Sequence, residues 1–124
     1  MNPQEEWQLS DDAPEIYERR LVPAMLGPLA APLIERAALQ PGERVLDIAC
    51  GTGVVARAAA RAAGPTGRVI GLDLNPGMLA VARARPPSAG APMAWLQANA
   101  QDLPIRDASF NAALSSQGFQ FFPD

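Results

Sequence analysis

Apolar residues gather in short runs separated by polar turns, and this pattern predicts strands that alternate with helices. The predicted strands are Arg44–Ala49, Arg68–Leu72, Met93–Ala98 and Ser109–Ser115. The predicted helices are Glu15–Arg20, Met25–Leu39, Val54–Ala63 and Asn75–Ala84. The near-continuous apolar character of the first strand is typical of a parallel strand covered on both faces. The sequence therefore predicts an α/β fold: a Rossmann-like, doubly wound, mainly parallel sheet preceded by N-terminal helices.

Prolines and arginines add detail to two of the predicted helical regions. Pro23 and Pro28 are expected to break the N-terminal helices, and Pro32 is expected to lie in a first turn. Arg57 and Arg61 lie four residues apart, so they share one face of their helix. We interpret that face as solvated.

The sequence ends shortly after the fourth predicted strand. A doubly wound sheet normally continues with further strands that cover such a strand. We therefore expect residues 1–40 to form an N-terminal helical segment, and residues 41–124 to form the first part of a larger domain, truncated after its fourth strand. That strand is a candidate surface for pairing with another polypeptide. Three aromatic side chains near the end are expected to pack in a core or against the missing half: Phe119, Phe121 and Phe122.

Composition excludes several kinds of chemistry. The net charge of −3 argues against a nucleic-acid-binding surface. The chain contains no histidine, which removes the commonest general base and any histidine-based metal site, so no metal is expected. Its one cysteine, Cys50, predicts a reducing, cytoplasmic compartment, and we interpret it as a small loop residue rather than a nucleophile. No stretch is long and apolar enough to span a membrane.

The segment between the first strand and the next helix carries the strongest functional signal. Asp47 lies inside the strand, and Gly51 and Gly53 follow it. Glycines let a backbone approach a ligand closely, and an acid at the end of the next strand, here Asp73, is placed to bind a ribose. This pairing predicts a nucleoside-bearing cofactor at the carboxyl edge of the sheet.

Three segments, in their order and spacing, resemble the class I S-adenosylmethionine-dependent methyltransferases. They are Val45–Gly53, Gly71–Leu79 and Leu103–Pro123. The resemblance is to the small-molecule branch that includes the quinone methyltransferases, known as the type 11 methyltransferase domain. Glu15–Pro23 also resembles the N-terminal helix of some members. The resemblance implies methyl transfer from S-adenosylmethionine to a small-molecule acceptor.

The resemblance also implies nine cofactor contacts and no assigned catalytic residue. The loop that holds the methionine part matches Asp47, Ala49, Gly51 and Gly53. The acid that binds the ribose hydroxyls matches Asp73, the apolar contacts to the adenine match Leu74 and Met78, and the contacts to the adenine edge match Asn99 and Ala100. Physical chemistry agrees for the methionine part, because a carboxylate attracts an ammonium and free backbone N–H groups suit a carboxylate.

Three positions depart from the pattern that the family usually has. Ala49 stands where a glycine is usual, and its methyl group narrows the approach slightly. Asn99 stands where an aspartate is usual, and its amide can both accept from the adenine amino group and donate to a ring nitrogen. Asn111 likewise replaces a common aspartate, which weakens a catalytic role for that position.

Other interpretations remain open. Asp47 can be a structural acid that bonds loop amides, and Asp73 a plain strand-end acid. The stretch from Gly51 to Ala56 also fits the fingerprint of nicotinamide-dependent oxidoreductases. Two features argue against the oxidoreductase interpretation. The first strand of a dinucleotide-binding fold is usually apolar where Asp47 stands, and residues 103–123 have no recognised counterpart in such a fold. A third possibility is a catalytically silent fragment or a binding module that needs a partner chain.

Overall fold

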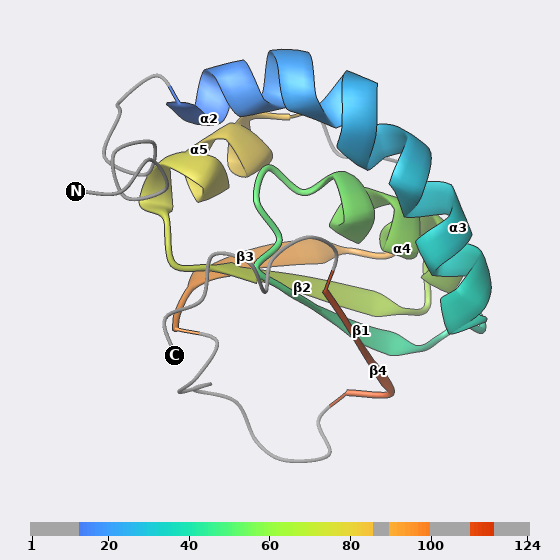
Figure 1. Ribbon diagram of the computed structural model, residues 1–124. Helices are drawn as coiled ribbons and strands as arrows, with labels where there is room; N and C mark the ends of the chain where they lie inside the picture. The colour runs from blue at the N-terminus through green and yellow to red at the C-terminus, as the bar shows by residue number, and fades with distance from the viewer. Residues whose placement is uncertain (1–12, 86–89, 100–109, 116–124) are drawn as a thin grey trace.

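The structure is a computed structural model that describes residues 13–85, 90–99 and 110–115. Its elements follow one another along the chain as helices and then alternating strands and helices (Figure 1). They are α2 (Ala13–Ile16), η1 (Tyr17–Leu26), α3 (Gly27–Ala37), β1 (Arg44–Ile48), α4 (Val54–Ala63), β2 (Arg68–Asp73), α5 (Pro76–Ala84), β3 (Met93–Gln97) and β4 (Ala112–Leu114).

The described strands form one parallel sheet in the order β3-β2-β1-β4. The chain runs outward from β1 to β3 and then returns to pair β4 on the other side of β1. This reversal places a topological switch point between β1 and β4, where ligands of such folds bind beyond the carboxyl ends of the strands. The parallel α/β fold predicted from the sequence is confirmed.

The core lies between the sheet and the helices, which gather on one face of it in Figure 1. Helix α4 packs directly on the sheet because the side it buries consists of one valine and four alanines. Small side chains let the helix backbone come close to Val45 and Val69, which are fully buried in β1 and β2. Helices α3 and α2 pack in turn against α4 and α5. The N-terminal helices therefore form an outer layer over the βα units.

The N-terminal prolines do not break the chain into separate helices, contrary to the prediction. Helix η1 has π-helical winding around Pro23, and the N–H of Gly27 donates to the carbonyl of Val22, five residues back. A proline clashes with the carbonyl four residues before it in an α-helix, and the wider π turn changes that spacing. Pro28 is the second residue of α3, which continues from η1 without a break. Pro32 lies inside α3 rather than in a first turn.

Helix α4 also corrects the prediction for its arginines. Arg61 is exposed, but the Arg57 side chain is only 12% exposed and makes polar contacts with neighbouring elements. The shared face is therefore not solvated along its whole length, because the half near the start of α4 is covered by η1.

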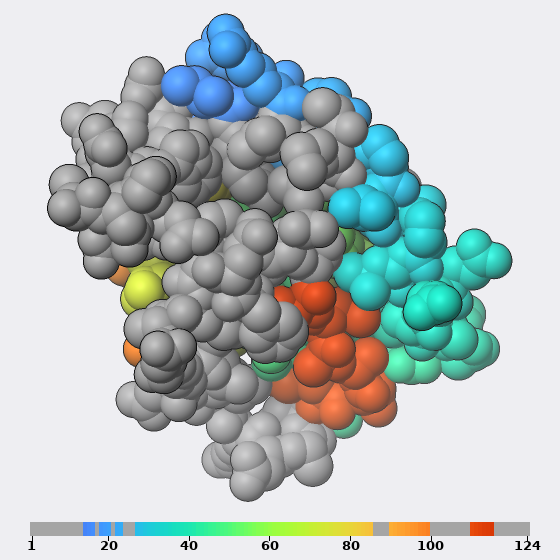
Figure 2. All heavy atoms as spheres, in the orientation of Figure 1, coloured from blue at the N-terminus to red at the C-terminus, as the bar shows by residue number. Residues whose placement is uncertain are grey.

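Strand β4 is shorter than predicted and lies at an edge of the described sheet, as expected. Figure 2 shows the segment 110–115 in orange-red, reaching the surface of the face in view. Asn111, just before the strand, accepts from the backbone N–H of Arg44 at 2.7 Å. Its side chain thus supports the pairing of β4 with β1. The predicted packing of Phe119, Phe121 and Phe122 lies outside the described residues. None of the described helices combines the length and apolar character needed to cross a bilayer.

Candidate functional site

The carboxyl edge of the sheet brings most of the predicted cofactor contacts together. In the register of the sheet, Ile48 at the end of β1 pairs with Leu72, and Asp73 pairs with Gln97. The segments that follow these strands therefore meet at one edge. The strand ends and these following segments carry eight of the nine predicted residues, Asp47, Ala49, Gly51, Gly53, Asp73, Leu74, Met78 and Asn99. Ala100 lies outside the described residues.

The loop between β1 and α4 has a left-handed backbone at three of its positions. Ala49 has φ of 56°, Gly51 of 59° and Gly53 of 93°. Glycine adopts this conformation freely, whereas an alanine pays about 1–2 kcal/mol for it. The structure thus gives a conformational reason why glycine suits the position of Ala49. The turn leads into the start of α4, whose first N–H groups have no acceptor within the helix.

Asp73 fastens this loop to the end of β2. One carboxylate oxygen accepts from the Gly51 N–H at 2.8 Å, and the other accepts from the Asn75 N–H at 2.9 Å. Burial raises the pKa of Asp73, while these backbone N–H groups act in the opposite direction. The acid is therefore part of the loop's own structure, and its remaining lone pairs are available to other donors.

Asp47 lies beneath the loop and is 1% exposed. Within the described residues its Oδ2 atom has no hydrogen-bond partner. Burial, and then the nearby charge of Asp73, raise the pKa of Asp47 to about 8, while the backbone of Ala56 lowers it. A buried carboxylate without a partner is costly, and a cation placed beside it relieves that cost. This arrangement fits a positively charged ligand group.

The ring of Trp95 on β3 leaves no room for a side chain at two positions of the site region, Gly71 and Gly53. The ring lies over β2, where a Cβ atom at Gly71 would come within 2.6 Å of it. A Cβ atom at Gly53 would also lie 2.6 Å from the ring. Gly53 is therefore required by packing as well as by its backbone conformation. A glycine in the middle of a predicted strand signals such a close approach, and Gly71 carried that signal in the sequence.

Cys50 behaves as the small loop residue that the sequence predicted. It is buried beside Gly71, and its backbone N–H donates to the Leu72 carbonyl at 2.8 Å. Burial raises the pKa of the Cys50 thiol, and the charges of Asp47 and Asp73 raise it further. The thiol is therefore held in its neutral, weakly nucleophilic form.

The segment after β2 begins helix α5 and carries the predicted adenine contacts. Asn75 caps the helix by accepting from the N–H groups of Gly77 at 2.8 Å and Met78 at 3.3 Å. Leu74 is 57% exposed beside Asp73, whereas the Met78 side chain is buried. Asn99 is exposed just beyond β3. An exposed leucine and an exposed amide flanking the acid suit the face and the edge of a flat heterocycle.

Glu18 is the most important residue of this region that the sequence analysis missed. It lies on η1, is 8% exposed, and accepts a hydrogen bond from the Thr52 hydroxyl in the glycine loop. It also pairs with Arg57 at 3.4 Å and with Arg85 at 3.0 Å. No sequence spacing connects residue 18 with residue 52, so no local pattern signals this contact.

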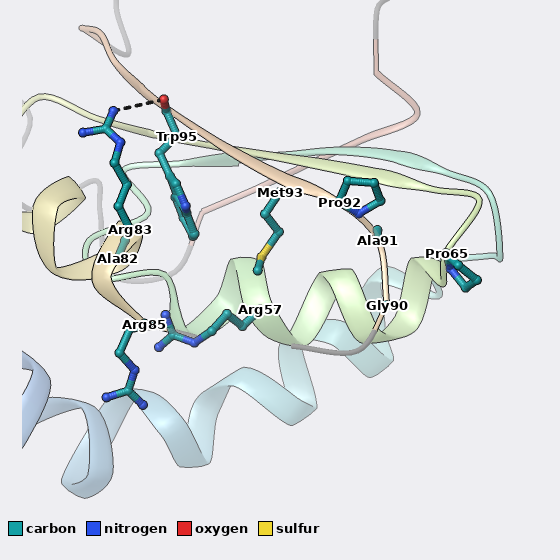
Figure 3. A pocket seen from close by; sticks show the side chains of 10 residues that line it. All are labelled: Arg57, Pro65, Ala82, Arg83, Arg85, Gly90, Ala91, Pro92, Met93 and Trp95. Atoms are coloured by element: carbon teal, nitrogen blue, oxygen red, sulfur yellow. Dashed lines mark hydrogen bonds between the residues drawn. The ribbon is translucent and has the colours of Figure 1, made fainter. Parts of the chain in front are cut away.

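A pocket of about 430 Å³ lies between α4, α5 and β3 (Figure 3). It is bounded by three arginines, by Met93 and Trp95, and by small residues and prolines. Figure 3 shows Arg57 and Arg85 near one another and Arg83 bonded to the Trp95 carbonyl, at 3.3 Å. Among the residues that the structure describes, none of the predicted cofactor contacts lines this pocket.

A parallel sheet with a glycine loop and two acids at its carboxyl edge is the arrangement of Rossmann-like cofactor-binding proteins. The sequence model of a family described as a methyltransferase domain matches residues 45–124. The match covers β1 from its second residue, the elements from α4 to β4, and the whole predicted site. The chain therefore belongs to this methyltransferase family.

Individual relatives agree with this assignment. An uncharacterised protein of Mycobacterium bovis is 40% identical over 117 residues, which are 94% of this chain and 39% of that protein. A 2-phytyl-1,4-naphtoquinone methyltransferase of Synechococcus elongatus is 39% identical over 93 residues, which are 73% of this chain and 40% of that enzyme. The crystal structure of a SAM-dependent methyltransferase from Aquifex aeolicus has a TM-score of 0.68 at 18% identity, covering 87% of this chain and 62% of that one, and so shares the fold. The chain spans 39% to 40% of the length of these two curated relatives.

Proposed function

We propose that the protein transfers a methyl group from S-adenosylmethionine to a small-molecule acceptor. The observation that carries the proposal is the pair of acids, Asp47 and Asp73, on either side of the left-handed glycine loop. Membership of the methyltransferase family supports the reaction class and does not favour a nicotinamide-dependent oxidoreductase.

Each predicted residue that the structure describes has a role in this proposal that its surroundings support. Asp47 attracts the ammonium of the methionine part, because its Oδ2 atom is buried and unpartnered within the described residues. The loop at Ala49, Gly51 and Gly53 presents backbone N–H groups to the carboxylate of the methionine part. Asp73 accepts from the ribose hydroxyls with the lone pairs that Gly51 and Asn75 leave free.

The adenine lies, in this proposal, beside the segments that follow β2 and β3. Leu74 and Met78 contact its face, and Asn99 and Ala100 contact its edge. The exposure of Leu74 and Asn99 at the sheet edge supports their roles. The role of Met78 is supported by its position in the first turn of α5.

When bound, the cofactor supplies an activated methyl group on a sulfonium, which an in-line displacement transfers to a nucleophilic atom. The chain's own part is to hold the reactants in line and to surround the positive charge with acids. With no histidine in the sequence, a general base is an acid of the protein or is replaced by ionisation of the substrate itself.

Titration calorimetry of the full-length protein with S-adenosylhomocysteine and with NAD tests the cofactor. We expect saturable binding of S-adenosylhomocysteine and none of NAD. The reverse result would assign the protein to the nicotinamide alternative. Transfer of a labelled methyl group from S-adenosylmethionine to a 1,4-naphthoquinol tests the acceptor class, since one relative is named for such a substrate. Cofactor binding without transfer to this or other small nucleophiles would favour a catalytically silent binding module.

Two further proposals concern the location of the protein and its pairing with another chain. A cytoplasmic location is supported by the single cysteine, which stays buried and neutral. Pairing with another polypeptide through β4 is supported by its position at the edge of the described sheet.

A further inference from the structure

One buried carboxylate joins the N-terminal helices to the glycine loop. Glu18 on η1 accepts from the Thr52 hydroxyl, and it faces Arg57 of α4 and Arg85 at the end of α5. The Glu18 side chain is 8% exposed and that of Arg57 is 12% exposed, whereas Arg85 is 49% exposed. Three elements thus converge on one side chain.

The burial of this cluster makes its charges interdependent. Burial lowers the pKa of Arg57, the charge of Glu18 raises it, and the nearby charges of Arg85 and Arg61 lower it again. Removing one member of a buried charge pair leaves the other without compensation. Glu18 is therefore the buried counter-charge of Arg57 beside the glycine loop.

Arg57 and Glu18 hold the same loop residue from two sides. Arg57 Nη1 donates to the Thr52 carbonyl at 2.7 Å, while Glu18 accepts from its hydroxyl. Thr52 is fully buried and lies between the two left-handed glycines. Its position thus helps to fix the backbone on both sides. Asp73 holds the preceding residue, Gly51, from β2.

Within this set of contacts, Glu18 alone comes from the N-terminal helical layer. A backbone that must present N–H groups to a ligand binds better when it is held in place beforehand. We propose that Glu18 is a positioning residue for the glycine loop, so that docking of the N-terminal helices and binding of the cofactor stabilise each other. The inference rests on the proposed function, because it requires that the loop bind S-adenosylmethionine. Such a coupling acts equally in both directions.

Glu18→Gln in the full-length protein is the direct test. It keeps the size of the side chain and removes the charge that Arg57 and Arg85 share. We expect S-adenosylhomocysteine to bind about tenfold more weakly, the size expected for losing one charge-assisted contact. Glu15→Gln is the matched control, because Glu15 is an exposed acid on the adjoining α2. Its dissociation constant should stay within about twofold of the parent value.

A purely structural role would lower the unfolding temperature and leave the dissociation constant of the folded protein unchanged. Binding is therefore measured well below the unfolding transition. Thr52→Val gives a second variant, which removes the hydroxyl without unpairing a charge. In the double variant the two losses of affinity should be less than additive, because Glu18→Gln weakens the hydrogen bond that Thr52→Val removes.

Hydrogen exchange provides the reciprocal measurement. S-adenosylhomocysteine should slow amide exchange in residues 13–26 of the parent protein, and should slow it less in Glu18→Gln. Unchanged affinity in Glu18→Gln and Thr52→Val, while the parent binds S-adenosylhomocysteine, would overturn this inference alone. A parent protein that binds no S-adenosylhomocysteine would overturn the proposed function and this inference with it.

Discussion

The connection between β1 and α4 differs from the connection between β2 and α5 in where its contacts come from. The second turn is held mostly by its own residues, because Asn75 caps the helix it precedes and Pro76 begins that helix. The first turn is held by residues far away in the sequence, namely Glu18, Asp73 and Trp95. A turn of the first kind can be predicted from a few residues, whereas a turn of the second kind depends on the whole fold.

The largest expected effect concerns Asp47, beneath the first turn, and is a change of the unfolding free energy with pH. Burial raises the pKa of Asp47 in the folded protein to about 8, from the ordinary aspartate value of 3.8. The folded protein therefore holds a proton at Asp47 that the unfolded chain has lost, so the free energy of unfolding should fall as pH rises from about 4 to about 8. The slope is at most about 1.4 kcal/mol per pH unit.

Urea unfolding of the unliganded protein across this range measures the effect. Asp47→Asn should flatten the slope, since the amide does not titrate. The raised pKa of Asp73 contributes in the same direction, so some slope should remain in the variant. A parent protein whose stability rises between these pH values would show that Asp47 is ionised when folded.

Gly53→Ala should break the first turn. The new methyl group meets the Trp95 ring at 2.6 Å, and the residue must keep a left-handed backbone. We expect a loss of about 3 kcal/mol of unfolding free energy, from the overpacking and the backbone strain together.

Gly64→Ala separates these two contributions. Gly64 has φ of 70°, and a Cβ atom there would have no neighbour within 4 Å. Chemical denaturation should show a loss of about 1–3 kcal/mol for this variant from the backbone alone, because φ of 70° with ψ of 178° is a conformation that essentially only glycine adopts. A loss at Gly53 of no more than about 1–2 kcal/mol, the backbone cost of a left-handed alanine, would mean that Trp95 moves aside at little cost.

Asp73→Ala should weaken both turns at once, because the carboxylate accepts from an N–H group of each. The expected loss is about 1–3 kcal/mol of unfolding free energy, since two partly buried donors lose their acceptor. Binding of S-adenosylhomocysteine should weaken by about 1–3 kcal/mol as well. Calorimetry and denaturation of the same sample measure both losses. A stable variant with unchanged affinity would remove Asp73 from the site and from the loop's support.

Asn75→Ala should disturb only the second turn. Loss of the helix cap is expected to lower the unfolding free energy by about 1 kcal/mol. Asn75→Asp is the comparison variant, because an aspartate also caps helices well. Cofactor affinity should weaken by less than about fivefold, because the cap bonds the N–H of the proposed adenine contact Met78 and bonds no residue of the glycine loop. A larger loss of affinity would show that the two turns are coupled through Asp73.

These differences explain how much the sequence could predict. The strands, helices α4 and α5, and the asparagine cap follow from patterns within a few residues. The loop glycines and Asp73 could be predicted because a parallel sheet brings the ends of its strands to one edge. The burial of Arg57 could not be predicted, because it depends on Glu18. Only the packed structure defines the position of Glu18 relative to α4. The π winding around Pro23 was also missed, because the sequence was interpreted with proline as a helix breaker.

Strand pairing has a further consequence for the order in which the chain assembles. The pairing of β1 with β2 joins residue 44 to residue 68, and that of β2 with β3 joins residue 69 to residue 93. The pairing of β1 with β4 joins residue 45 to residue 112. Closing a longer loop sacrifices more chain entropy before any contact forms. Strand β4, with three residues and the most distant partner, is therefore expected to join the sheet last during folding and to leave it first during local unfolding.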